Sequence, residues 1–255
     1  MGKKQVILPR KDKDGNYYIS YSQYNSFNDI KGFNTSLPGV WEYIQQKFFD
    51  INFPDQGWGM FGHDVENYIC YKNANKKTID KLDKENKNKG ERLIDDSLNS
   101  FTEKEKEILN TVKPLGNFQQ EIKIWLLDNV YLLGYIDDSL EDLLHLRDYK
   151  TGSKNSVQKY YKDEYKQLDI YAMYTLQETK KLPHTLEVCM IERKGNCYGM
   201  KNRRDLLSVG ENVWYHKRET SVGRINKIKK EIIETVYQIS DLYSVYLKTK
   251  DLKQL

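Results

Sequence analysis

The amino-acid sequence predicts a mixed α/β or α+β fold in which a central mixed β-sheet is flanked by helices. Apolar residues recur at helical spacing through the first part of the chain, and the pattern changes to strands over residues 118–151. Helical spacing then returns and is clearest over residues 221–250. A block of strands between two groups of amphipathic helices is typical of layered folds in which helices cover a sheet.

Composition limits the classes of protein to which the chain can belong. The 255 residues include 41 Lys and Arg and 37 Asp and Glu, so the net charge is only +4. That balance excludes a histone-like polycation and an acidic tail protein. It leaves nucleic-acid binding open, because local patches of charge matter more than their sum.

The N-terminal part is expected to be helical. Residues 16–33 form a tail that leads into a short helix near Ser22, and residues 37–51 and 61–74 have amphipathic helical patterns. The polar stretch 75–113 is expected to end in a helix, because Thr102 and Glu105 have the spacing of a capping box. Its first half is either a solvated helical face or a mobile insertion.

The C-terminal part is expected to contain the sheet. Residues 118–151 form strands joined near SLED, and a long helix is predicted over residues 157–181. Two further strands, TLEVCMIER and CYGMK, flank a turn at Lys194-Gly195-Asn196. We see no linker, so we expect a single domain in which a helical part, about 20–113, packs on a core of about 114–255.

The cysteines and the hydropathy pattern favour a cytoplasmic protein. Cys70, Cys189 and Cys197 are scattered and form no Cys-x-x-Cys motif, which favours reduced thiols over a disulfide framework or a zinc site. No run of about 18 apolar residues indicates a membrane span, and the first residues lack the apolar region of a signal peptide.

The predicted strand pair brings three charged residues together. If Asp137 lies opposite Asp148, their Cβ atoms are roughly 5 Å apart on one face of the hairpin. Lys150 shares that face because side chains alternate along a strand. Two carboxylates at this distance repel each other unless a cation lies between them. An exposed hairpin with ordinary surface charges is the alternative interpretation.

Such a group suits a particular chemistry. Two carboxylates and a nearby backbone carbonyl are ligands that a hard cation such as Mg²⁺ prefers. A lysine beside them can hold an attacking water or a phosphate oxygen. The pattern is therefore typical of metal-assisted phosphodiester hydrolysis.

Four short motifs extend this pattern along the chain. GMFGHDVE contains Gly-x-x-x-His, HLRDYKTG contains Asp-x-Lys-Thr-Gly, and QLDIY places Gln167 and Tyr171 on one helix face. In order, the motifs are Gly59 to His63, Gly134-Tyr135-Ile136-Asp137, Asp148-Tyr149-Lys150-Thr151-Gly152, and Gln167 to Tyr171. Together they resemble the PD-(D/E)XK nuclease superfamily, and within it the RecB-type exonuclease branch, over about residues 59–171.

The resemblance implies a restriction-endonuclease-like core and a role for each matching residue. His63, Asp137 and Asp148 would bind Mg²⁺ or Mn²⁺ together with the backbone carbonyl of Tyr149. Lys150 would orient the water and stabilise negative charge in the transition state. Gln167 and Tyr171 would line or support the DNA side of the site.

The resemblance also sets expectations about cofactors and partners. Some relatives carry four cysteines around an iron–sulfur cluster; this chain has no such set, and we expect no cluster. The chain has no helicase motif, so any unwinding of DNA would come from a helicase or recombination partner. The source is expected to use an AT-rich genome, and a phage is one possibility that the family allows.

Other candidate residues are supported by weaker patterns. Lys201, Arg203 and Arg204 form a basic cluster that suits phosphate contacts, although a solvated basic loop explains it equally well. Glu66, one helical turn after His63, could support the metal ligands or form a surface ion pair. Glu121 lies on a strand that approaches the site.

The functional hypotheses fall into three classes. The first is a divalent-metal-dependent deoxyribonuclease, an exonuclease of recombination, repair or phage replication. The second is a structure-specific or restriction-type endonuclease on the same core, with RNA as a possible substrate. The third is a catalytically silent DNA-binding module, which the complete set of Asp137, Asp148 and Lys150 disfavours.

Overall fold

A computed structural model describes residues 5–28, 36–51, 57–162, 165–197, 200 and 203–252 of the chain. The strands are β1 Tyr17–Ser20, β2 Asn117–Leu127, β3 Val130–Ser139, β4 His145–Gly152, β5 Thr185–Lys194 and β6 Ser208–Arg218. The helices are α1 Tyr21–Asn28, α2 Ser36–Phe48, α3 Gly57–Tyr71, α4 Lys76–Lys89, α5 Ile94–Leu98, α6 Glu103–Asn110, α7 Gln158–Tyr161, α8 Gln167–Thr179 and α9 Val222–Leu252. Two 3₁₀ turns, η1 Lys154–Ser156 and η2 Arg204–Leu206, complete the described elements.

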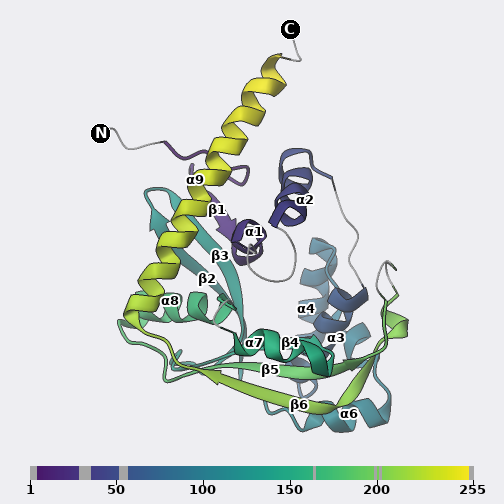
Figure 1. Cartoon of the computed structure of the whole chain (residues 1–255). Helices are drawn as coiled ribbons and strands as arrows, with labels where there is room; N and C mark the ends of the chain where they lie inside the picture. The colour runs from purple at the N-terminus through teal and green to yellow at the C-terminus, as the bar shows by residue number, and fades with distance from the viewer. Residues whose placement is uncertain are drawn as a thin grey trace.

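The six strands form one mixed sheet, which confirms the predicted fold class (Figure 1). The strand order is β1-β3-β4-β5-β6, and β2 pairs with the other edge of β3. The β1–β3 and β4–β5 pairs are parallel, whereas β2–β3, β3–β4 and β5–β6 are antiparallel. The predicted hairpin between β3 and β4 is present, with Asp138 opposite Arg147.

Two hydrophobic cores lie on the two faces of this sheet. Alternate residues of β5 supply both: Leu186, Val188 and Met190 belong to one core, and Cys189 and Ile191 belong to the other. The first core also takes residues from α1, α8 and α9, and the second takes residues from α3 and α6. Helices therefore cover the sheet on both faces.

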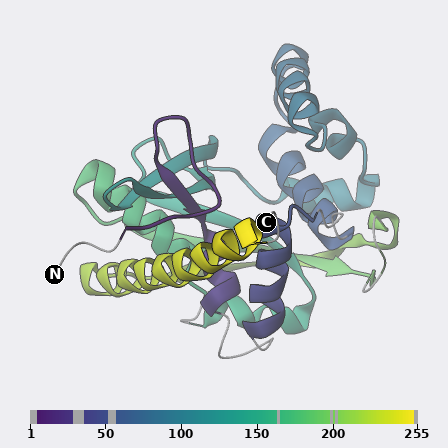
Figure 2. The same cartoon turned by 90° about the horizontal axis from the view of Figure 1, so that it is seen from above.

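The polar stretch after α3 folds as helices. Asn75 caps the start of α4 by accepting a hydrogen bond from Thr78, and Gly90 ends the helix with a left-handed φ of 71°. The predicted capping box of Thr102 and Glu105 is present at the start of α6. In Figure 2, α4 lies at the periphery of the fold, on the side away from α9.

The first strand, β1, differs from the sequence prediction, which places residues 16–20 in a tail. Tyr17–Ser20 pairs in parallel with Val130–Leu133 of β3, which brings the beginning of the chain into the sheet. A four-residue strand with no alternating pattern gives too little periodicity to be recognised. The helix predicted to follow it is present as α1.

The predicted helix over 157–181 is wrong, because the chain breaks it into α7 and α8. Lys162 is extended, with a φ of −82° and a ψ of 149°. The Arg218 guanidinium donates to the backbone carbonyls of Lys162 and Tyr165, so it satisfies groups that the break leaves without helical partners. The break depends on a residue from β6 and is invisible in the local pattern.

The predicted strand CYGMK is also wrong at its described residues, since Cys197 and Met200 lie outside the strands. The strand that pairs with β5 is β6, in which Ser208 lies opposite Lys194. Gly195 leaves the ladder with a φ of +88°, and a Cβ there would lie 2.0 Å from the carbonyl oxygen of Leu206. Among the described helices, none is long and apolar enough to cross a membrane.

Candidate active site

The candidate site lies where the sheet opens between β3 and β4. One edge of β3 pairs with β1 at residues 130–133 and with β4 only at Asp138 and Ser139. Residues 134–137 of that edge therefore lie between two partner strands, without a register partner among the described strands. Asp137 is at the end of this gap, and continuing the register of Asp138 and Arg147 places it opposite Asp148.

The side chain of Asp137 closes the gap on one side. The backbone N–H of Tyr149 points from β4 towards β3 and donates to Asp137 Oδ2 at 2.9 Å. The carbonyl of Tyr149 points the same way, and Lys150 Nζ donates to it at 3.0 Å. A carboxylate and an ammonium group thus take the place of backbone pairing at this position.

Asp148 and Lys150 share one face of β4, as the alternation predicts. Lys150 Nζ donates to Asp148 Oδ1 at 2.7 Å. Asp148 is fully buried, whereas the Lys150 side chain keeps 26% of its surface exposed. Lys150 therefore connects the buried carboxylate to the open side of the site.

Tyrosine hydroxyls from the α7–α8 region fix the two carboxylates. The hydroxyl of Tyr171 lies 3.3 Å from Asp137 Oδ1 and 3.2 Å from Asp148 Oδ1. Gln167 Nε2 donates to that hydroxyl at 2.9 Å, and Tyr165 donates to Asp148 Oδ2 at 2.6 Å. Gln167 and Tyr171 are one turn apart on α8, so they reach the same point from one helix face.

The carboxyl groups of the site are crowded, so that each disfavours a negative charge on the others. Burial raises the pKa of Asp137 well above its usual value, and the charges of Glu66 and Asp148 raise it further. Burial also raises the pKa of Glu66 to about 7, with Lys150 opposing and Asp148 adding to the shift. Burial opposes the charge of Lys150, yet the Asp148 and Asp137 carboxylates raise its pKa. Asp137 and Glu66 thus hold their protons more tightly than usual, although the charge of Lys150 opposes this effect at both.

His63 is not brought into contact with the acidic pair. Its side chain is exposed, on the first half of α3. Glu66, three residues later, is coupled to the site through the charges described above. Residues three apart share a helix face, so His63 lies one turn from Glu66 on the same side of α3. Its role as a metal ligand stays a prediction.

The predicted DNA-binding cluster is separated by the structure. Arg204 is a structural residue: its Nε lies 2.7 Å from the buried Asp64, and its guanidinium packs on Phe61 and Phe101. Arg203 is exposed and makes two hydrogen bonds of 2.8 Å to Asp205. Lys201 lies outside the described residues. The local pattern could not reveal that Asp64, far away in sequence, neutralises Arg204.

Two residues of the site were missed or ranked low in the sequence. No sequence pattern indicates that Tyr165 belongs to the site, and its hydrogen bond to Asp148 is formed next to the break between α7 and α8. For Glu66, the sequence supports a role in the site and a surface ion pair equally. Its position one turn after the Gly-x-x-x-His motif was the only sequence signal.

The donor set suits a divalent cation. Lys150 Nζ, a cation, is held by Asp148 Oδ1 and the Tyr149 carbonyl, two of the oxygens that the sequence predicts as metal ligands. Acidic and carbonyl oxygens of this kind favour Mg²⁺ or Mn²⁺. Within the described residues, no three His, Cys, Asp or Glu side chains already stand together as a metal site.

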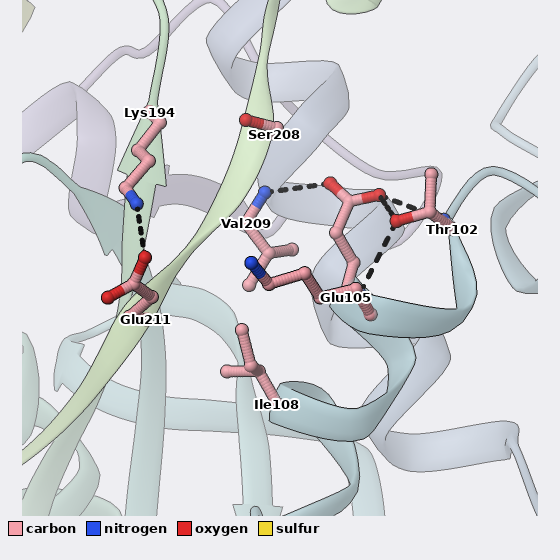
Figure 3. A pocket seen from close by; sticks show the side chains of 8 residues that line it. Thr102, Glu105, Ile108, Lys194, Ser208, Val209 and Glu211 are labelled. Atoms are coloured by element: carbon pink, nitrogen blue, oxygen red, sulfur yellow. Dashed lines mark hydrogen bonds and ion pairs between the residues drawn. The ribbon is translucent and has the colours of Figure 1, made fainter.

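A separate hollow of about 240 Å³ lies between α6 and the β5–β6 pair (Figure 3). Three of its charged side chains have partners, and one of them, Glu105, accepts hydrogen bonds of 2.8 Å from the N–H groups of Thr102 and Val209. Lys194 pairs with Glu211 at 3.1 Å. These contacts attach α6 to β6, and we interpret the hollow as a packing crevice.

Comparisons with known proteins support the fold. No family model matches the chain, and no curated protein matches it in sequence. The structure is similar to the crystal structure of a protein from Eubacterium rectale named "Putative exonuclease". The TM-score is 0.52 with 12% sequence identity, over 89% of this chain and 82% of the other. At this identity the likeness establishes a shared fold.

Proposed function

We propose that this protein is a divalent-metal-dependent DNA nuclease, and that it is an exonuclease. The observation that carries the proposal is the convergence of Asp137, Asp148 and Lys150 where the sheet opens between β3 and β4. A hairpin with ordinary surface charges would not bury Asp148 or surround it with tyrosine hydroxyls. The name of the Eubacterium rectale protein supports the exonuclease among the nucleases of this fold.

In this proposal, Asp137, Asp148 and the carbonyl of Tyr149 hold Mg²⁺ or Mn²⁺, and His63 adds an imidazole. The bound metal would polarise a phosphoryl oxygen and lower the pKa of a water molecule. Lys150, which already contacts two of the ligand oxygens, positions the attacking water and offsets charge on the phosphate. Tyr165, Tyr171 and Gln167 keep the carboxylates oriented.

The proposal is tested with purified protein, Mg²⁺ and end-labelled linear, nicked and closed-circular DNA. We expect degradation of linear DNA, no cutting of the closed circle, and loss of activity in excess EDTA. A closed circle cut at one position would replace the exonuclease with the restriction-type endonuclease. Full activity in EDTA would reject the metal.

Two controls extend this experiment to the other hypotheses. A labelled RNA strand of the same sequence distinguishes a deoxyribonuclease from an RNA-directed relative. DNA binding without any cleavage, in Mg²⁺ and in Mn²⁺, would instead indicate the catalytically silent module. Since the chain has no helicase motif, we propose that a helicase or recombination partner supplies any unwinding of duplex ends.

A further inference from the structure

A second, larger hollow lies beside the candidate site. Its volume is about 590 Å³, and it is bounded by the η1–α7 segment on one side and by β6 on the other. The residues that line it are Lys154, Val157, Gln158, Tyr161, Lys162 and Trp214. We call this the α7–β6 groove. Its lining combines two aromatic rings with two cations and contains no carboxylate among the described residues.

The sheet connects this groove directly to Lys150. Lys150 of β4 lies opposite Met190 of β5, and Met190 lies opposite Trp214 of β6. Residues paired in this way have their side chains on one face, so Lys150 and Trp214 are on the same face of the sheet, two strands apart. Neighbouring strands are about 4.8 Å apart, which separates the two backbones by roughly 10 Å. A stacked nucleic-acid strand advances about 3.4 Å per nucleotide, so roughly three nucleotides bridge this distance.

Helix α7 borders both places with consecutive residues. The ring of Tyr160 packs edge-on against Tyr165 at 5.0 Å, and Tyr165 donates to Asp148. The next residue, Tyr161, lines the groove, and its ring lies 4.1 Å from the ring of His216 on β6. The groove and the site thus lie on two sides of the short helix α7.

The groove has the properties of a surface that stacks bases. Tyr161 is 48% exposed, and Trp214 is half-buried and lines the hollow. Lys154 and Lys162 supply positive charge at the rim. Arg193 lies close enough to lower the pKa of Tyr160 by its charge, although burial raises that pKa overall. Aromatic faces next to cations are the usual means of holding unpaired bases and their phosphates.

We infer that the α7–β6 groove binds single-stranded DNA, with bases stacked on Trp214 and Tyr161 and phosphates near Lys154 and Lys162. The inference rests on the proposed function, in which the phosphate to be cleaved lies at Lys150. The groove would hold the DNA strand that continues from this phosphate. Bases in a duplex already stack on one another inside the helix, so these rings favour an unpaired strand. The groove therefore selects single strands, or ends that have been opened, as substrates.

The test measures binding without cleavage. Fluorescence anisotropy of a labelled oligothymidine, in EDTA, reports affinity for the wild-type protein and for Tyr161→Ala and Trp214→Ala. Loss of one stacked base is expected to weaken binding about 5- to 150-fold. Tyr161→Phe and Trp214→Phe should retain most of the affinity, because they keep a ring in place. Binding of a blunt duplex of the same length should change little.

Trp125→Ala is the matched control. Trp125 is also exposed, at 50%, but it lies on β2, with Lys229 over its ring. The strand order separates β2 from β6 by three strands, so this variant should bind the oligothymidine as the wild type does. Circular dichroism checks that each variant is folded. Tyr161→Ala should disturb folding least, because it truncates a half-exposed ring.

The outcomes separate this inference from the proposed function. If Tyr161→Ala and Lys154→Ala bind oligothymidine as tightly as the wild type, the groove is not the binding site, even if the protein cleaves DNA. If the wild type binds no single strand in EDTA, the inference is also rejected. If the protein fails to cleave any DNA but Tyr161→Ala weakens binding and Tyr161→Phe does not, the groove is confirmed and the nuclease is not.

Discussion

The two faces of the β3–β4 pair carry similar charged residues, but the number of partners of these residues differs between the faces. On one face, Asp138 accepts hydrogen bonds from the N–H groups of Leu115 and Gly116, at 2.8 and 3.1 Å, and from the Tyr149 hydroxyl at 2.7 Å. Arg147 lies 3.6 Å from the same carboxylate. On the other face, the neighbouring Asp137 accepts one hydrogen bond from a backbone N–H group and one from a tyrosine hydroxyl.

The partners of the cations differ in the same way. Arg147 is nearly buried and connects Asp138 to Glu187, with its Nε 2.6 Å from the Glu187 carboxylate, and it also donates to the carbonyl of Lys113 at 2.7 Å. Lys150 is more exposed and contacts Asp148, and its charge also acts on the carboxyl groups of Asp137 and Glu66. A guanidinium group with fixed, multiple contacts makes a structural cluster. In contrast, Asp137 and Glu66 have raised pKa values that a further cation nearby would lower. The comparison predicts loss of stability on one face and loss of activity on the other.

The largest expected effect is that of Arg147→Ala on stability. The substitution leaves Glu187 and Asp138 buried without their guanidinium partner, which typically costs about 3–5 kcal/mol. Urea denaturation followed by circular dichroism measures the free energy of unfolding. Lys150→Ala, on the other face of the same strand, is the control and should cost less, because the hydroxyls of Tyr165 and Tyr171 still contact Asp148. Equal losses for the two variants would contradict the distinction between the faces.

Lys150→Ala should strongly reduce catalysis. Loss of one group that stabilises charge in the transition state lowers the rate by on the order of 10²–10³. DNA affinity at moderate salt should change far less than the rate, since the variant keeps every proposed metal ligand. Single-turnover cleavage of end-labelled linear DNA provides the measurement. A variant that cuts at a near wild-type rate would place the active site elsewhere.

Asp148→Ala is the companion variant, and it distinguishes loss of the metal from loss of the Lys150 charge. It should abolish cleavage as well, but through loss of the cation, so titration calorimetry should show weaker Mn²⁺ binding. Lys150→Ala should bind Mn²⁺ at least as tightly as the wild type, because the ammonium group no longer occupies the Asp148 and Tyr149 oxygens. Unchanged Mn²⁺ affinity in Asp148→Ala would reject this carboxylate as a ligand.

Tyr165→Phe should have an intermediate effect on activity. It removes the hydroxyl that holds Asp148 Oδ2 at 2.6 Å while keeping the ring that packs against Tyr160. Groups that orient a metal ligand typically contribute 10- to 100-fold to activity or metal affinity. Tyr160→Phe provides the matched control on the adjoining ring. Similar activities for the two variants would show that Tyr165 only packs.

His63→Ala should have the smallest effect of this series. The exposed imidazole lies one turn from Glu66, so we expect it to add one ligand at the open side of the site. Its loss should weaken Mn²⁺ binding by roughly tenfold, which corresponds to about 1.4 kcal/mol. Mn²⁺ is the informative cation because it accepts an imidazole more readily than Mg²⁺ does. Unchanged Mn²⁺ affinity would make His63 an ordinary surface residue.

The sequence by itself determined the parts of the site that lie within one strand or one helical turn. Alternation places Asp148 and Lys150 on one face, where they are in contact. Hairpin register predicts Asp137 opposite Asp148, in agreement with the observed pairing of Asp138 with Arg147. Helical spacing likewise placed Gln167 and Tyr171 together. These relations depend only on the period of the backbone, which the local pattern of residues reveals.

Only the tertiary structure decided which charges are available for chemistry. Arg204 and Arg147 resemble Lys150 in sequence, but Asp64 and Glu187, distant along the chain, bind them in buried ion pairs. The break before α8 likewise depends on Arg218 from β6, and it is this break that allows Tyr165 to reach Asp148. Whether a charge is neutralised depends on neighbours that folding brings from elsewhere, and no local period encodes them.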